Sequence, residues 1–260
     1  IKLTNLEQLL KVMSQLRDEE NGCEWDKEQT FESLAPYAIE EAYEVADSIE
    51  RKNIKDLKEE LGDLLLQVVF ISQIAKEANL FSFEDVASSI TEKLIRRHPY
   101  VFSDKRDHSS GEQTEQWERI KEKERISKNQ TGVLDGIAKN LPSLKRSQKI
   151  QKRASGVGFD WPDTKGVFEK IKEETSELED AFESLNRDQI EEEIGDLLMI
   201  ITNLSQKQEI DAENALRRAN NKFIKRFSYI EDELKKSHKN FSEVNLQELD
   251  SLWEDSKKLG

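Results

Sequence analysis

Acidic residues at helical spacing are the side chains of this sequence best suited to chemistry. In the segment EEAYE, Glu41 and Glu44 lie three residues apart, and in EELGD the pair Glu60 and Asp63 has the same spacing. Side chains at this spacing project from one face of a helix. Two helices that present such pairs to each other would gather four carboxylates, which like-charge repulsion opposes unless cations bind between them. The pattern predicts a divalent-cation site with oxygen ligands, suited to Mg²⁺ or Mn²⁺.

The same acidic pattern occurs a second time in the chain. EETSE carries Glu174 and Glu177, EEIGD carries Glu193 and Asp196, and the two segments are as far apart as in the first half. The motif GCEWD likewise returns as GFDWP. A lone Glu-x-x-Asp on a helix is usually a solvated charged face, but here both copies keep all four acids and run directly into apolar segments. The chain therefore reads as a tandem repeat.

Each half also carries a pair of basic residues one helical turn apart. These are Lys93 and Arg97 in KLIRR, and Lys222 and Arg226 in KFIKR. Both members of such a pair can reach one anion, Arg with a planar fork and Lys with a point charge. The chain has 40 Lys and Arg residues, so a solvated pair is the ordinary alternative, and only the repetition argues for a role.

Composition predicts an all-α protein with almost no strand. Charged residues make up 36% and hydrophobic residues 35% of the chain, with 4 Pro and 10 Gly, which suits amphipathic helices. A net charge of −14 argues against binding of duplex nucleic acid. The longest apolar stretch, LLLQVVFISQIA, is too short to span a membrane. Cys23 stands alone, and IKLTNLEQLLKV lacks the layout of a signal peptide, so we expect a cytoplasmic protein without membrane contact.

The expected architecture is two tandem helical units, 1–130 and 131–260, joined by the polar segment SKNQTGVLDG. A few helices cannot easily cover their own apolar faces, so we expect each unit to complete a four-helix-type bundle through homodimer formation. The apolar spacing predicts these helices: Leu34–Glu50, Asp56–Lys76, Phe83–Arg97, Val167–Leu185 and Asp211–Lys236.

Two other metal or phosphate chemistries are excluded by missing motifs. Di-iron bundles need Glu-x-x-His pairs, and none of His98, His108 and His238 has a Glu three residues before it. No Gly-x-x-x-x-Gly-Lys phosphate loop is present either.

The combination of Glu-Glu-x-x-Glu, Glu-x-x-Asp and a Lys-x-x-x-Arg helix resembles the MazG family of nucleoside triphosphate pyrophosphohydrolases. The resemblance covers nearly the whole chain, including NGCEWDKEQTFESLAPYAIEEAYEV, RRHPYVF, QKIQKRA and GFDW. It implies an all-α fold and Mg²⁺-dependent hydrolysis of NTPs or dNTPs, ATP included, to NMP or dNMP and pyrophosphate, in a house-cleaning role for the nucleotide pool.

The resemblance also implies roles for particular residues. Metal binding is carried onto Glu174, Glu177, Glu193 and Asp196, and onto Glu41, Glu44, Glu60 and Asp63. The adjoining acids Glu173 and Glu40 are the candidates for holding or deprotonating the attacking water, with a plain surface role as the alternative. Contacts to the substrate are expected from Lys170, Glu192, Lys222, Arg226, Trp253, Lys93 and Arg97.

The two units are not equal in these residues. Lys170 precedes the acids of the second unit by one helical turn, whereas Tyr37 stands at that place in the first. We therefore expect the second unit to carry most of the activity. Two other functions stay open at this point: a nucleotide-sensing or interaction module that binds without turnover, and a helical scaffold whose acids are incidental.

Overall fold

The computed structural model describes residues 3–102, 110–127 and 129–258, and the regular structure of those residues is entirely helical. The chain divides into two compact units, Ile1–Ile120 and Lys121–Gly260. This division falls inside the helix Ser110–Ser127, before the boundary predicted near Gln130. The boundary near Gln130 stays a prediction. None of the described helices is both long and apolar enough to cross a membrane.

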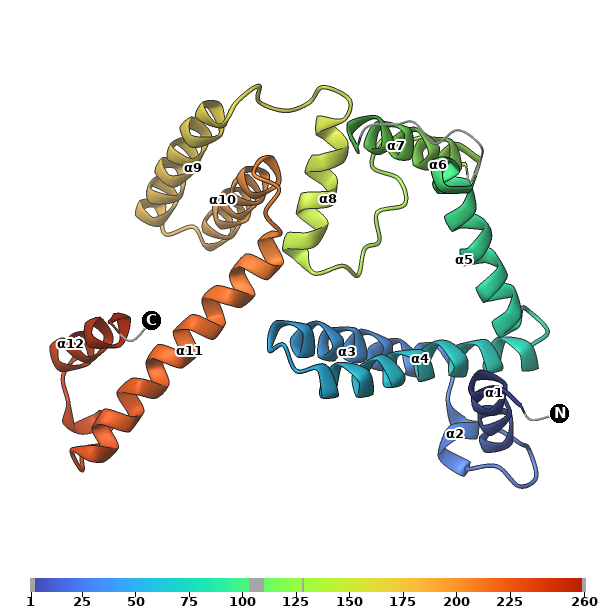
Figure 1. Cartoon of the computed structure of the whole chain (residues 1–260). Coiled ribbons are helices and arrows are strands. Elements are labelled where there is room, and N and C mark those ends of the chain that lie inside the picture. Colours follow the sequence, from blue (N-terminus) through green and yellow to red (C-terminus); the bar gives the residue numbers. More distant parts are fainter. Residues whose placement is uncertain (1–2, 103–109, 128, 259–260) are drawn as a thin grey trace. The chain divides into compact units, whose positions relative to one another are not determined.

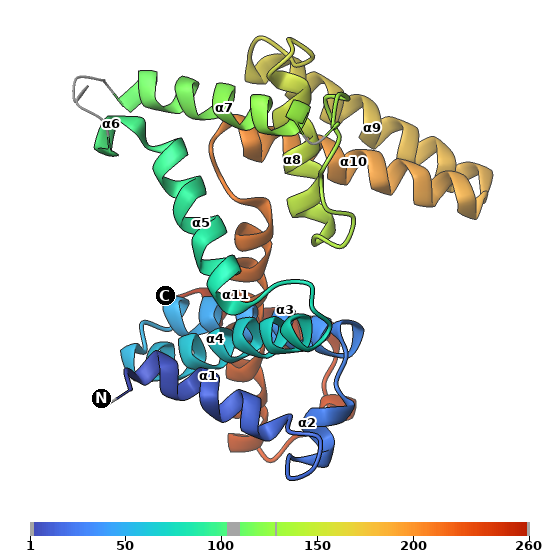
Figure 2. The same cartoon turned by 90° about the vertical axis from the view of Figure 1, so that its right-hand side faces the viewer.

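The first unit is built around a pair of long helices that lie side by side in both views (Figures 1 and 2). Its core joins Met13, Leu34, Val69 and Phe70, which come from three different helices. The elements are α1 (Asn5–Leu16), α2 (Glu24–Glu28), α3 (Phe31–Glu50), α4 (Ile54–Glu77), α5 (Phe83–Arg97), α6 (Pro99–Phe102) and α7 (Ser110–Ser127), the last of which continues into the second unit.

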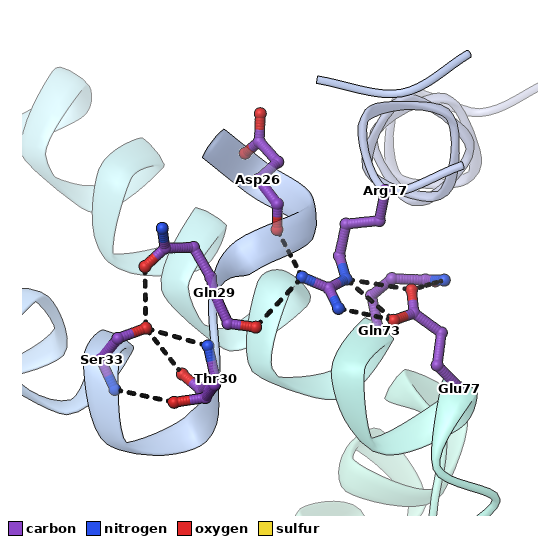
Figure 3. Close-up of polar contacts among 7 residues, drawn as sticks. All are labelled: Arg17, Asp26, Gln29, Thr30, Ser33, Gln73 and Glu77. Atoms are coloured by element: carbon purple, nitrogen blue, oxygen red, sulfur yellow. Dashed lines mark hydrogen bonds and ion pairs between the residues drawn. The ribbon is translucent and has the colours of Figure 1, made fainter. Parts of the chain in front are cut away.

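Arg17 at the end of α1 links α4 to the segment that leads into α3, residues 18–30, which we call the entry loop of the first unit. Its guanidinium group pairs with Glu77 at 2.7 Å and donates to the backbone carbonyls of Asp26 and Gln29. It also lies over the ring of Phe70, 5.6 Å from the centroid. Figure 3 shows the guanidinium bridging the loop and α4. Because Gln29 immediately precedes the capping residue of α3, this contact helps to set where α3 begins.

The second unit repeats the long helix pair. Its elements are α8 (Ser143–Ser155), α9 (Thr164–Ser184), α10 (Arg187–Lys207), α11 (Ala212–Lys236), the 3₁₀ helix η1 (Phe241–Glu243) and α12 (Leu246–Lys257). Val167 and Ile200 are buried where α9 meets α10. Helix α8 packs on α10 as α1 packs on α4, and Gln151 on α8 donates to the carbonyl of Met199 on α10 at 3.0 Å.

A mostly buried ion pair holds the entry loop of the second unit, residues 156–163, against α10. Lys207 on α10 contacts Asp160 at 2.8 Å, with both side chains 13% exposed, and Asn203 donates to the same carboxylate at 3.2 Å. Burial acts to raise the pKa of Asp160, but the hydrogen bonds from Lys207 and Asn203 outweigh it, so this pKa lies below its ordinary value. In the first unit Glu24 stands at the matching place of the motif, and it pairs with Lys27 although its own side chain is 85% exposed.

The helices expected from apolar spacing are confirmed to within a few residues. Phe83–Arg97 is found with those bounds, while the helix expected from Leu34 begins at Phe31 because Thr30 and Ser33 form a capping box there. Asp211, expected inside a helix, is instead the N-cap of α11, accepting from the backbone of Asn214. The all-α class is likewise confirmed.

Candidate metal and nucleotide site

The acidic residues of each unit lie on its pair of long helices. Three residues connect α3 to α4, and two residues connect α9 to α10. An asparagine caps the second helix of each pair: Asn53 accepts from the backbone of Lys55 and Asp56, and Asn186 does the same for α10. The short connections bring the two helices of a pair side by side, and the helices pack on each other with the acids at the contact.

The spacing predicts four converging carboxylates in each unit, and three of them converge in the structure. Glu41 and Glu44 on α3 approach Glu60 on α4, and their ligand oxygens lie within 4.8 Å of one another. In the second unit Glu174, Glu177 and Glu193 form the matching group at the same limit.

Repulsion within the first group is visible in the electrostatics. The pKa of Glu41 lies above its ordinary value, first because of burial and then because of the charges of Asp63 and Glu44. The pKa of Glu60 is raised in the same way, by burial and then by Glu44 and Asp63. Asp63 thus belongs to the same charge cluster although it lies outside the tight group of three.

Repulsion also raises pKa values in the second group, but there a lysine opposes it. The pKa of Glu193 is raised by burial and then by the charges of Glu177, Glu174 and Asp196. The pKa of Glu177 is also raised by burial and by Glu174, but Lys170 acts in the opposite direction. Asp196, like Asp63, adds to the negative charge without joining the tight group.

Lys170 forms ion pairs with two acids of the second unit. Its ammonium group contacts Glu173 at 2.7 Å and Glu174 at 2.8 Å, and these two hydrogen bonds raise the pKa of Lys170. The side chain of Glu174 is only 6% exposed. Lys170 was expected at the substrate, and its pairing with these acids was not predicted, although the spacing of three and four residues on one helix is the signal for it.

The candidate water-binding acids are on the surface beside these groups. Glu40 and Glu173 are both exposed, and the charge of Glu40 contributes to the raised pKa of Glu41. Glu192 is also exposed and acts on the pKa of Glu193. Their positions leave them open to solvent and to a ligand, and their roles stay predictions.

The basic pairs lie on helices that leave the acidic groups. Helix α11, which carries Lys222 and Arg226, packs mainly on α12 and α8, with only a small contact to α10, and it leads away from the α9–α10 pair in Figure 1. Lys93 and Arg97 are on α5, which contacts α4 and α6. Within the described part of each unit, the helix that carries the basic pair therefore has little contact with the helices that carry the carboxylates.

Trp253 is part of an aromatic cluster between α11 and α12. Its ring lies 5.1 Å from that of Phe223, and the guanidinium of Arg226 lies 5.7 Å from its centroid. Phe227 stacks on both Phe223 and Phe241. Arg226 and Trp253 are thus neighbours in space as well as in predicted role.

Gly62 and Gly195 follow the acids inside α4 and α10. A Cβ atom added at either would meet nothing within 4 Å. Within the described part of each unit, no neighbouring helix therefore approaches these glycines closely.

The donor sets fit a small divalent cation. All candidate ligands are carboxylate oxygens, which Mg²⁺ and Mn²⁺ prefer. Ligands in an octahedron around Mg²⁺ at about 2.1 Å lie roughly 3 to 4 Å apart, and the 4.8 Å limit within each group permits this after small side-chain movements. A bound cation would also relieve the mutual repulsion of the acids.

Fold and site together define a tandem all-α protein with a converging group of carboxylates in each unit. The family model of the MazG nucleotide pyrophosphohydrolase domain matches this chain twice, over residues 29–102 and 164–230. The chain is 44% identical to the "Nucleoside triphosphate pyrophosphohydrolase" of Escherichia coli (strain K12), over 98% of both chains. It is 47% identical to the "Nucleoside triphosphate pyrophosphohydrolase/pyrophosphatase MazG" of Thermotoga maritima, over 96% of this chain and 95% of that one.

The chain belongs to the MazG family, and the resemblance seen in its motifs is thereby confirmed. Both matched ranges include the acids and the basic pair of their unit.

Proposed function

We propose that this protein is a Mg²⁺-dependent nucleoside triphosphate pyrophosphohydrolase that converts NTPs or dNTPs to the monophosphate and pyrophosphate. The observation that carries the proposal is the converging carboxylate group, present in both units, in a chain that matches named pyrophosphohydrolases along nearly its full length. Mn²⁺ is the natural substitute for Mg²⁺ at such ligands. House-cleaning of the nucleotide pool is the role we assign, and such an enzyme meets its substrates in the cytoplasm.

The metal ligands we assign are the acids facing across each helix pair. In the second unit they are Glu174, Glu177, Glu193 and Asp196, and in the first Glu41, Glu44, Glu60 and Asp63. A divalent cation at these ligands supplies neutralisation of phosphate charge and activation of water.

The remaining residues act on water and on the triphosphate. Glu173, and Glu40 in the first unit, accepts a proton from the attacking water. The water oxygen forms a new bond to phosphorus as the α–β anhydride bond breaks, and the bridging oxygen leaves on the other product. Lys222 and Arg226, with Lys93 and Arg97 in the first unit, bind phosphate oxygens. Lys170 and Glu192 contact the substrate, and Trp253 stacks on the base.

We further propose that a second copy of the chain completes each bundle. Apolar side chains next to the acids are exposed, among them Leu61 and Leu65 on α4 and Leu198 and Met199 on α10. The space beside Gly62 and Gly195 suits the close approach of such a partner. Homodimer formation would cover these side chains, and it offers a route by which basic pairs that leave their own acids can reach a carboxylate group.

Product analysis in ¹⁸O-labelled water tests the function. A panel of canonical and modified NTPs is incubated with Mg²⁺, with Mn²⁺ and with chelator, and phosphorus products are resolved by mass. We expect NMP and pyrophosphate, with the label in one of them, in either metal and no turnover in chelator. Orthophosphate with NDP as primary products would exclude the proposed reaction. Metal-dependent nucleotide binding without turnover would instead identify a sensing module.

A further inference from the structure

The carboxylate groups of the two units differ in what faces them. In the second unit the ammonium group of Lys170 contacts the buried Glu174 at 2.8 Å and Glu173 at 2.7 Å. It thus lies on a metal ligand and on the candidate water-binding acid together. A positive charge belonging to the chain already stands in part of the space where an external cation would bind.

The first unit has no such charge. Tyr37 takes the place of Lys170, and its ring instead packs edge-on against Trp25 at 6.3 Å. Among the described residues, no ion pair includes Glu41, Glu44 or Glu60. Among the described residues, the negative charge of this group is therefore not compensated by an ion pair.

We propose that Lys170 exchanges between Glu174 and the triphosphate, so that the second unit binds its divalent cation tightly only together with a nucleotide, whereas the first unit binds the cation alone. The proposal rests on the proposed function, since it concerns that same metal and substrate. The chemistry is competition of two cations for one carboxylate. A buried carboxylate is costly without a counter-charge, so Lys170 leaves Glu174 only when the metal replaces it.

The triphosphate provides the second half of the exchange. The flexible four-carbon stem of lysine lets the ammonium group move to phosphate oxygens, which are strong acceptors for it. Metal and nucleotide therefore act together: the metal takes the place of Lys170 on Glu174, and the triphosphate accepts the displaced ammonium group. By linkage, metal and nucleotide must then strengthen each other's binding by the same factor.

Binding of Mn²⁺ to the full chain tests this exchange directly. Glu41→Gln with Glu60→Gln removes the first site, so that the remaining binding, followed by the electron paramagnetic resonance of free Mn²⁺, reports the second unit. In this background we expect Lys170→Met to raise the affinity for Mn²⁺ without nucleotide by about tenfold. Lys170→Gln, which keeps a polar side chain, is expected to behave likewise.

A second measurement uses an NTP analogue with a methylene group between the α and β phosphorus atoms, which blocks hydrolysis. With Lys170 present, the analogue is expected to raise the affinity for Mn²⁺, and Lys170→Met should reduce this coupling by about tenfold. Lys172→Met is the matched control: it removes an exposed lysine of the same helix and should change neither quantity by more than about twofold.

Unchanged or weakened Mn²⁺ binding without nucleotide in both Lys170 variants, with circular dichroism showing folded protein, would overturn the exchange. An effect of equal size in Lys172→Met would do the same, because it would assign the change to net charge. If either outcome overturned the exchange while the natural chain still formed NMP and pyrophosphate, the proposed function would stand without the exchange. Absence of Mn²⁺ binding in every variant, with and without nucleotide, would overturn both.

Discussion

Lys222 and Arg226 lie one turn apart on α11, and each has a distinct neighbourhood. Lys222 is exposed, whereas Arg226 is half-buried with its guanidinium over the ring of Trp253. A cation over an aromatic ring keeps its outer edge available for hydrogen bonds. The arrangement suits a nucleotide whose phosphates meet the two basic groups while its base lies near the tryptophan.

Alanine at Lys222 or Arg226 should weaken binding of the NTP much more than binding of the NMP. Each charged hydrogen bond lost costs on the order of 1.5 to 3 kcal/mol, and the contacts we assign are to phosphates that the NMP lacks. Calorimetric titration with the methylene analogue and with the NMP measures both. Lys235→Ala, an exposed position further along α11, is the control expected to leave both affinities unchanged. Equal losses for NTP and NMP would move these residues away from the triphosphate.

At the scale of elements, each entry loop is fastened to the long helix pair by a different charged residue. The first unit uses Arg17, which reaches from α1 to Glu77 and to the loop carbonyls. The second uses Lys207 on α10, which reaches Asp160 and the carbonyl of Trp161. Both contacts hold the segment that precedes the acid-bearing helix, α3 or α9, against the partner helix, α4 or α10.

Asp160→Asn should lower the free energy of unfolding by about 3 kcal/mol at neutral pH, because it leaves the mostly buried Lys207 without its counter-charge. Urea denaturation of the full chain, followed by fluorescence, measures the change. Glu24→Gln at the matching position of the first unit removes a carboxylate that is 85% exposed and should cost less than about 1 kcal/mol. Similar losses in the two variants would mean that burial of the Asp160–Lys207 pair adds nothing to the free energy of unfolding.

The same pair predicts the direction of a pH dependence. The pKa of Asp160 is depressed in the folded chain, so its stabilising effect is complete above the pKa it has when unfolded, about 4. The effect is lost as the pH falls through the lower folded pKa. The difference in unfolding free energy between the natural chain and Asp160→Asn should therefore be full at pH 7 and shrink below about pH 4.

At the scale of the whole molecule, the chain holds two versions of one unit that differ beside their acids. Both keep a group of three glutamates at the same closeness, so both keep the geometry for a cation. Among the residues that the structure describes, only the second group has a lysine paired with it. Turnover also needs a hold on the triphosphate, and for this reason we expect the units to contribute unequally.

Paired double variants test this inequality. Glu193→Gln with Asp196→Asn should reduce kcat per chain by at least about a hundredfold, since removing ligands costs more than disturbing their outer partners. Glu60→Gln with Asp63→Asn should leave most of the activity. Both should stay folded, because each removes charges that repel one another in the metal-free state. Light scattering controls for the oligomeric state. Equal loss of kcat in two intact variants would make the units equivalent.

The sequence by itself determined which segments are helical and which acids share a face. Both properties are local: backbone hydrogen bonds fix the helical period, and the period fixes that Glu41 and Glu44 project together. Repetition of the acids, and their match to the MazG motifs, predicted the two units and the family. Capping chemistry explains the small errors in helix bounds, as at Thr30 and Asp211.

Only the tertiary structure decided which charges meet and how deeply they are buried. The contact of Asp160 with Lys207 joins residues 47 positions apart, and nothing in the local pattern distinguishes it from the exposed pair of Glu24. The burial of Glu174 under Lys170 likewise depends on the packing of α9 against α10. Side-chain burial is set by the neighbouring helix rather than by the residue's own helix, and burial decides whether a charge pair is a surface feature or part of a site.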